Sequence, residues 1–301
     1  MTFAMFVQYF ASGIARGSVY AIIALGFTLV YNTCDIINFA QGEFVMLGAM
    51  IVAVVFYKIL HFPLFLAALL AVVCVALIGY LAARLTIYPL REASPLNMII
   101  ATIGLSILIR GTAMSIWSKD PQNLPAFSEQ GPVNQICRNI LDKTGIYIDP
   151  QNIWILIFAL IVMSAMILFF KFTITGRAMR ACAQNRIGAQ ICGIKPSWMM
   201  IYAYVLSATL GAATGIVIAP QTTAQYDMGV MLGLKGFCGA IIGGLFSFPG
   251  AIIGGLLLGM SESLGAALCQ SEFKDAITFF ILLLVLYLKP AGIFGRKQHA
   301  T

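Results

Sequence analysis

The stretch GAIIGGLFSFPGAIIGGL, residues 239–256, contains the heptapeptide GAIIGGL twice, once on either side of Pro249. Isoleucine and leucine fill the positions between the glycines, which argues against a flexible linker. No Lys-Ser or Lys-Thr pair follows the glycines, as it would in a phosphate-binding loop. Proline cannot continue a helix but suits the first turn of the next one. The stretch therefore predicts two helical pieces that break near residues 248–249.

Each piece carries the G-x-x-x-G spacing that favours close helix packing. In lipid, this spacing leaves a flat helix face that a second backbone can approach closely. We therefore predict helix packing through Gly239, Gly243, Gly250 and Gly254. The pattern leaves open whether the packing partner belongs to this chain or to a second subunit.

The composition indicates that lipid surrounds most of the chain. Its 301 residues are 60% hydrophobic and only 10% charged, whereas a soluble domain has about 25% charged residues. Apolar runs of the length that spans a bilayer, about 20 residues, lie near 8–31, 44–60, 63–83, 96–117, 152–171, 199–219, 229–268 and 273–289. We expect an all-α polytopic membrane protein with one transmembrane domain over residues 1–301. The runs allow about 8–10 membrane segments, re-entrant half-helices included.

Two polar stretches interrupt the spans and differ in charge. Residues 118–151 hold three basic and four acidic side chains, whereas residues 172–198 hold no acidic side chain and four basic ones, Arg177, Arg180, Arg186 and Lys195. Basic loops stay in the cytoplasm. We therefore expect a cytoplasmic loop at 172–198 and, one span away, an outer loop at 118–151. The net charge of +7 does not indicate nucleic-acid binding, because the basic residues gather beside spans.

The same counting of charges constrains the run 229–268. It must return to the outer side from which it starts, either by crossing twice or as a re-entrant hairpin. At the other end of the chain, the N-terminus lies outside if all three runs before Arg84 span the membrane. It lies inside if one of them is re-entrant.

Polar side chains concentrate between the first two runs. Residues 31–50 include Asn38, Gln41 and Glu43. They fit either an ordinary interfacial turn or a broken segment that lines a cavity, because polar groups at membrane depth need protein or water beside them. We take these three residues as the candidate translocation path.

Three further ionisable residues lie near or within spans. Arg110 fits a side chain that extends to the interface, and a place on the pathway is the alternative. Lys235 and Glu262 flank the two GAIIGGL copies, and each fits the interface or the pathway equally well.

The basic loop predicts a short amphipathic helix over residues 178–192. Apolar residues recur every fourth position along it, at Met179, Ala183, Ile187 and Ile191. Gly193 suits the C′ position of that helix, and Pro196 follows it. Such a helix either lies on the anionic leaflet through its arginines or docks into a groove on a cytoplasmic partner.

Motifs for enzyme chemistry are missing from the sequence. It contains no G-x-x-x-x-G-K-[ST], H-E-x-x-H or G-x-S-x-G motif, and its two histidines, His61 and His299, are far apart. We expect no catalytic residue, metal site or cofactor on this chain. Three transport classes remain: a permease driven by a separate ATPase, a secondary transporter and a channel.

Three stretches carry a resemblance to a known family: GIARGSVYAIIALGFTLVYNTCDIINFAQGEFVMLGA (13–49), GRAMRACAQNRIGAQICGI (176–194) and GLKGFCGAIIGGLFSFPGAIIGGLLLGMSESL (233–264). In register over nearly the whole chain, they resemble the LivH-type permeases of bacterial branched-chain amino acid ABC importers. The family pattern reads N-F-A-H-G-E, and here Gln41 replaces its histidine, so the titratable group at that position is absent.

The resemblance implies a function, a location and partners. It implies a multi-pass subunit of the bacterial inner membrane that moves branched-chain amino acids inward by alternating access. Its partners would be a second, LivM-like permease, two cytoplasmic ATPases that use ATP, a periplasmic binding protein and membrane lipid. The basic loop would be the ATPase-coupling element, with Arg177, Arg180, Gln184, Arg186 and Gly193. A relative that imports urea or short amides is the alternative, ahead of a channel or secondary transporter.

Overall fold

The computed structural model describes residues 3–91, 93–117, 119–127, 133–135, 137–138, 141, 147, 149–268 and 274–295. Seven stretches are helical, apolar and long enough to cross a membrane. They are α1 (Phe3–Cys34), α2 (Gln41–Met50) with its π-helical continuation η1 (Ile51–Ile59), α3 (Leu64–Ala82) with η2 (Ala83–Ile87), α4 (Pro95–Trp117), α6 (Pro150–Phe172), α9 (Pro196–Thr222) and α11 (Phe248–Leu268).

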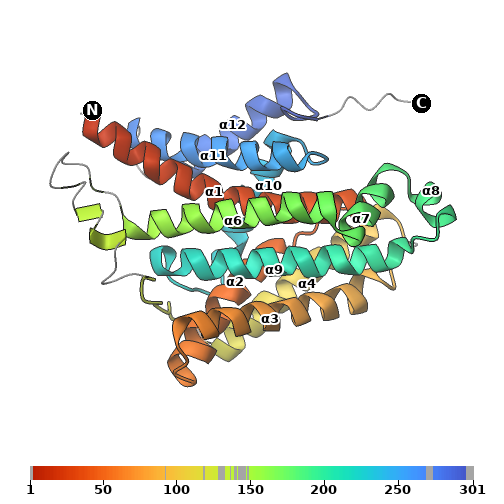
Figure 1. The fold of residues 1–301 in the computed structure, drawn as a ribbon, viewed down its shortest axis with the longest axis horizontal. Helices are drawn as coiled ribbons and strands as arrows, with labels where there is room; N and C mark the ends of the chain where they lie inside the picture. Colours follow the sequence, from red (N-terminus) through yellow and green to blue (C-terminus); the bar gives the residue numbers. More distant parts are fainter. Residues whose placement is uncertain are drawn as a thin grey trace.

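Four shorter helices complete the set that is labelled in Figure 1: α7 (Ile174–Gln184), α8 (Arg186–Ile191), α10 (Met228–Gly243) and α12 (Lys274–Leu288). Of these, α10 and α12 are also apolar. The expected all-α polytopic membrane fold is confirmed, and each predicted apolar run forms helix. Part of the predicted outer loop 118–151 lies outside the described residues.

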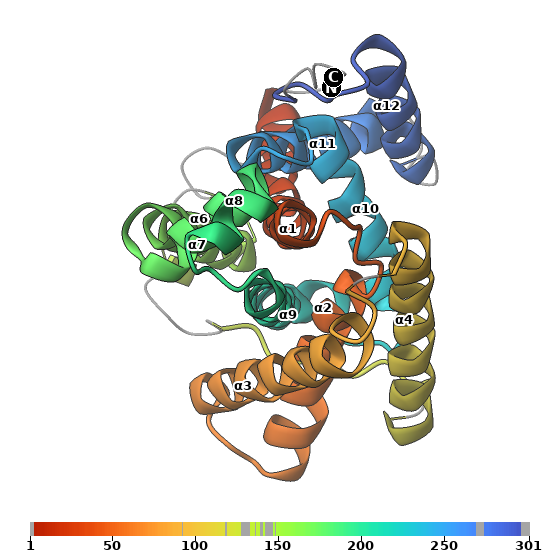
Figure 2. The ribbon, with the colours of Figure 1, turned by 90° about the vertical axis from the view of Figure 1, so that its right-hand side faces the viewer.

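Helix α1 is the centre of the bundle. Of an 18-residue apolar segment of α1, 89% of the residues are buried. The corresponding share in α4 is only 17%. Seen along the bundle, α1 lies between α6 and α10, with α9 and α11 on its other sides (Figure 2). A helix with neighbours all round can be apolar all round, whereas α4 leaves most of its surface to lipid.

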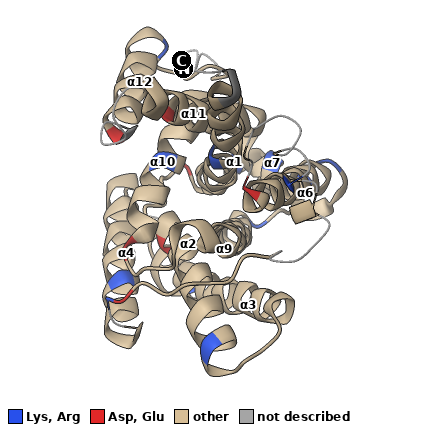
Figure 3. Ribbon diagram, turned by 90° about the vertical axis from the view of Figure 1, so that its left-hand side faces the viewer, with Lys and Arg blue, Asp and Glu red and all other residues tan. Residues whose placement is uncertain are grey.

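The two ends of the bundle differ in charge. We call one end the basic end, defined by Arg84, Arg91, Lys171, Arg177, Arg180, Arg186 and Lys195. Helices α7 and α8 lie at this end, whereas the N-terminus lies at the opposite end (Figure 1). The three apolar runs before Arg84 thus carry the chain from the N-terminal end of the bundle to the basic end. Seen from the N-terminal end, charged positions are few on the described helices (Figure 3).

Helices α10 and α11 form a hairpin whose ends can be placed from two contacts. Just before α10, Ala224 forms a pair of backbone hydrogen bonds of 2.8 and 2.9 Å with Gln122 at the end opposite the basic end. Just after α10, the Phe246 carbonyl accepts a hydrogen bond of 3.4 Å from Asn32 near the basic end. The run 229–268 thus contains two antiparallel helices that turn near the basic end, and α10, with 16 residues, is shorter than the seven stretches that are long enough to cross a membrane.

The structure places all four glycines of the repeat at the contact between α10 and α11. A Cβ atom on Gly254 would overlap the Gly239 carbonyl oxygen, and one on Gly243 would overlap the Gly250 carbonyl oxygen. The chain turns at Gly244, whose φ is +100°, and Pro249 lies in the first turn of α11. The packing partner of each repeat is thus the other repeat of the same chain.

Further glycines bring α11 against α1, the most extensive helix contact in the fold. A Cβ on Gly259 would overlap the Gly17 backbone, and one on Gly255 would overlap Ala21. The sequence analysis did not identify this contact or a similar one between α2 and α9, where Gly215 packs on the Val45 carbonyl. Their G-x-x-x-G spacings, such as 211–215 and 255–259, are a signal that could have found them.

We expect Gly254→Ala to destabilise the protein by about 1–3 kcal/mol, because the new methyl group overlaps backbone that cannot move aside easily. Gly104→Ala in α4 is the matched control, since a Cβ there meets no atom within 4 Å. The measurement is the thermal unfolding midpoint of each purified variant in detergent. Equal midpoints for the two variants would contradict this account of the hairpin.

Candidate functional site

The predicted path residues Asn38 and Gln41 are fully buried. Both bond within the protein, although Asn38 Nδ2 has no hydrogen-bond partner among the described residues. Asn38 Oδ1 accepts a hydrogen bond of 3.1 Å from the Ala40 amide at the start of α2. Gln41 Nε2 donates to the Ser207 carbonyl at 3.1 Å, and the Ser207 hydroxyl donates to Gln41 Oε1. Both residues thus hold the first turn of α2, and Gln41 ties that turn to α9.

Glu43 differs from these two residues because it reaches a cavity. Its side chain is 1% exposed, and its Oε1 accepts a hydrogen bond of 2.9 Å from the Ser106 hydroxyl of α4. Its Oε2 is buried and has no hydrogen-bond partner among the described residues. A buried carboxylate oxygen without a donor is costly, so this atom favours a ligand or a cation beside it.

The cavity beside Glu43 has a volume of about 380 Å³ and lies between α2, α4 and α10. Three glycines form its tightest wall: a Cβ on Gly42 would overlap the Gly229 carbonyl, and one on Gly233 would lie 2.8 Å from the Gly42 Cα. Most of the other lining residues are apolar. Arg110 also lines the cavity. The structure therefore places Arg110 at this cavity, the less favoured of its two expected positions.

A second polar cluster joins Lys235 and Glu262, which the sequence left unassigned. Lys235 Nζ lies 2.9 Å from Glu262 Oε1 and 2.7 Å from Asp275 Oδ1. The Tyr20 hydroxyl donates to Glu262 Oε2 at 2.8 Å. The cluster links α1, α10, α11 and α12. Opposite charges on the two halves of one helix hairpin are a signal that could have predicted the Lys235–Glu262 pair.

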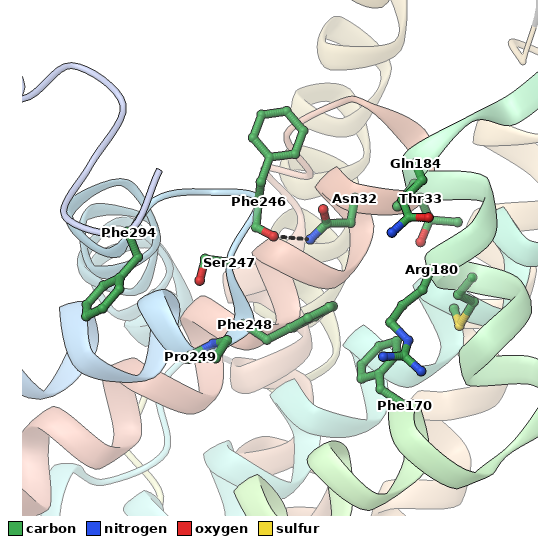
Figure 4. A pocket seen from close by; sticks show the side chains of 12 residues that line it. Asn32, Thr33, Phe170, Arg180, Gln184, Phe246, Ser247, Phe248, Pro249 and Phe294 are labelled. Atoms are coloured by element: carbon green, nitrogen blue, oxygen red, sulfur yellow. Dashed lines mark hydrogen bonds between the residues drawn. The ribbon is translucent and has the colours of Figure 1, made fainter. Parts of the chain in front are cut away.

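A third feature is a cleft of about 670 Å³ at the basic end, between α7 and the turn after α10. Arg180 and Gln184 of α7 lie on one side of it, facing Phe246 and Phe248 on the other (Figure 4). Of the five expected coupling residues, Arg180 and Gln184 line this cleft. The side chains of Arg177 and Arg186 are exposed elsewhere on the basic end.

The prediction of a single helix over residues 178–192 is wrong, because the chain forms two helices there. Asn185 takes an extended conformation with φ of −154°, ends α7, and accepts a hydrogen bond of 2.8 Å from the Gly188 amide as the N-cap of α8. The apolar stripe is broken accordingly: Met179 is buried, whereas Ile187 and Ile191 are 71% and 83% exposed. Asparagine is more favourable as a helix N-cap than inside a helix. At this position that preference had a stronger effect than the apolar residues at every fourth position.

Gly193 lies just after α8 with φ of +81°, the left-handed conformation expected of a C′ glycine. A Cβ there would meet no atom within 4 Å. Its backbone conformation, and not crowding, therefore favours glycine.

The long apolar helices of this bundle are those of a polytopic membrane protein, and a buried carboxylate faces a cavity among them. The chain belongs to the family described as the branched-chain amino acid transport system permease component, whose model matches residues 9–286. The resemblance stated from the sequence is thus confirmed.

Known relatives match the chain over nearly its full length. The high-affinity branched-chain amino acid transport system permease protein BraD of Pseudomonas aeruginosa is 32% identical over 301 residues, 97% of either chain. The corresponding LivH protein of Escherichia coli K12 is 32% identical, over 98% of this chain and 97% of its own. A probable LivH protein of Methanocaldococcus jannaschii is 26% identical, over 91% and 88%. No solved structure matches the chain significantly.

We expect Lys235→Met to destabilise the protein by about 3–5 kcal/mol, because it leaves the buried Glu262 carboxylate without its cation. Lys58→Met is the matched control, since Lys58 is exposed and donates a hydrogen bond of 3.0 Å to Gln122. Adding Glu262→Leu to Lys235→Met is expected to recover part of the loss, as measured by a double-mutant cycle on unfolding. A Lys235→Met variant as stable as Lys58→Met would rule out this role.

Proposed function

We propose that this chain is a permease subunit of an ATP-binding-cassette importer that moves branched-chain amino acids into the cytoplasm. Family membership over residues 9–286 supports the substrate class. In this proposal the protein lies in a bacterial inner membrane with its basic end in the cytoplasm, as the positive-inside bias favours. A second, LivM-like permease, two ATPases and a periplasmic binding protein complete the importer, and ATP is used by the partner chains.

The observation that carries the coupling part of this proposal is the position of α7. This helix contacts α1, α6 and α9 at the basic end. Gly176, in its first turn, packs directly on the backbone of Phe169 and Phe170. The Phe170 ring in turn lies 4.4 Å from the Phe248 ring at the start of α11. A displacement of α7 by an ATPase would therefore act on α6 and on the α10–α11 hairpin together.

The exposed surface of α8 supports docking on a partner. Ile187 and Ile191 are one helical turn apart and both are exposed, beside Arg186. An apolar helix face with flanking arginines suits a groove with an apolar floor and an acidic rim. In the mechanism, the ATPases bind α7 and α8, and their closure on ATP shifts the hairpin so that the path opens to one side at a time.

We expect the reconstituted complex of this chain with its partner permease, ATPases and binding protein to accumulate leucine in vesicles. Leucine, isoleucine and valine are expected to stimulate ATP hydrolysis, whereas urea and acetamide are not. The measurements are labelled-solute uptake and phosphate release. Stimulation by urea alone would contradict the substrate class. Leucine uptake that continues without ATP or any ATPase would indicate a channel.

Changes in the coupling segment are expected to abolish uptake while the protein remains inserted. Gly193→Val strains the left-handed C′ position by about 1–2 kcal/mol, whereas Gly193→Asn, which tolerates that conformation, is the matched control. Reversing Arg177 and Arg180 to Glu is expected to have the same effect as Gly193→Val, through lost contacts with the ATPase. Normal leucine-stimulated ATP hydrolysis in these variants would exclude a coupling role for the segment.

A further inference from the structure

The cavity beside Glu43 presents one acidic and one basic side chain within apolar walls. Glu43 is held from one side only: Ser106 donates to Oε1 at 2.9 Å, whereas Oε2 is buried without a partner among the described residues. A Cβ atom on Gly229 would lie 3.1 Å from Oε2, so glycine at this position leaves space beside that atom. A molecule in the cavity can supply the donor that Oε2 lacks, and a positively charged donor gives the strongest bond.

The basic side chain is one helical turn away on α4. Ile103, Ser106, Ile107 and Arg110 recur at spacings of three and four residues, and all four line the cavity. Side chains four residues apart on a helix have Cβ atoms about 5–6 Å from each other. Because Ser106 bonds directly to Glu43, the Arg110 side chain starts about one turn beyond the Glu43 carboxylate.

Aromatic rings form the apolar part of the cavity. The Phe237 ring of α10 lies 5.5 Å from the Phe27 ring of α1 and 5.9 Å from the Phe39 ring, measured between centroids. All three rings line the cavity. Rings packed on one another keep fixed positions and offer an apolar surface to an aliphatic group.

We propose that this cavity binds an aliphatic α-amino acid as a zwitterion. The α-ammonium group donates to Glu43 Oε2, the α-carboxylate accepts from the Arg110 guanidinium, and the side chain packs on Phe27, Phe39 and Phe237. The two charges of an α-amino acid share one carbon atom, so a single molecule can bridge protein charges about one helical turn apart. This assignment rests on the proposed function, which it extends by naming the groups that recognise the substrate.

The same arrangement discriminates against neutral solutes. A urea or acetamide molecule in the cavity would leave the Glu43 carboxylate and the Arg110 guanidinium without opposite charges. Sites built around polar pairing reject ligands that leave a buried group unpaired much more strongly than they reject small differences in apolar size. The cavity therefore favours amino acids over amides, although it distinguishes leucine from valine only weakly.

The test is equilibrium binding of three ligands to the detergent-solubilised transporter complex: L-leucine, L-leucinamide without the carboxylate, and 4-methylpentanoate without the ammonium. In the wild-type complex, leucine is expected to bind at least about tenfold more tightly than either analogue. An analogue that binds as tightly as leucine would overturn the assignment, and this comparison does not depend on the folding of any variant.

Two variants then test which protein side chain binds the ammonium group of the ligand and which binds its carboxylate. Glu43→Gln, which keeps an acceptor for Ser106, is expected to weaken leucine and leucinamide binding about 10- to 100-fold and to leave 4-methylpentanoate nearly unchanged. Arg110→Gln is expected to weaken leucine and 4-methylpentanoate but not leucinamide. Asp120→Asn, an exposed acid-to-amide change, is the matched control. A variant that weakens the binding of all three ligands equally would overturn the assignment.

Uptake by the wild-type complex separates the two proposals. If the complex accumulates leucine but binds leucinamide or 4-methylpentanoate as tightly as leucine, the assignment of the zwitterion site is wrong and the proposed function stands. If it neither binds nor accumulates leucine and urea stimulates ATP hydrolysis instead, both are wrong.

Discussion

The close approach of helix backbones at glycine contacts is the constraint on which this structure depends. Lipid tails are as apolar as leucine, so helices within a bilayer gain little from burying leucine against one another. Here α11 meets α10 through Gly254 and α1 through Gly255 and Gly259, side by side along one helix. These contacts hold α1 at the centre of the bundle. They also fix the hairpin whose far side presents Gly229 and Gly233 to α2.

Some of the few polar groups between these closely packed backbones have defined partners. Gln41 bonds to Ser207, and Lys235 joins Glu262 and Asp275. Such groups persist in a membrane protein only against protein or water. Glu43 Oε2 differs from them, since it is buried beside a cavity without a partner among the described residues. The three path residues predicted together thus divide into two that fix α2 and one that faces a cavity.

The basic end and the cavity are connected through the same hairpin. Its turn lies beside α7, where Phe248 contacts Phe170, and its first helix, α10, forms one wall of the Glu43 cavity. In the proposed importer, a displacement of α7 would therefore reach the substrate site through one continuous element. Rigid helices packed on glycines are suited to this, because they move as bodies and do not deform locally.

The sequence by itself determined the spans, the break at Pro249, the left-handed Gly193 and the family, because hydropathy, proline and glycine act locally. It failed at Asn185, where a cap divided the predicted helix into α7 and α8. It also left open the side on which the N-terminus lies. Only the tertiary structure decided that Asp275 and Tyr20 join the Lys235–Glu262 pair and that Glu43 shares a cavity with Arg110. Those residues are far apart in the chain, and only the packing of helices in three dimensions brings them together.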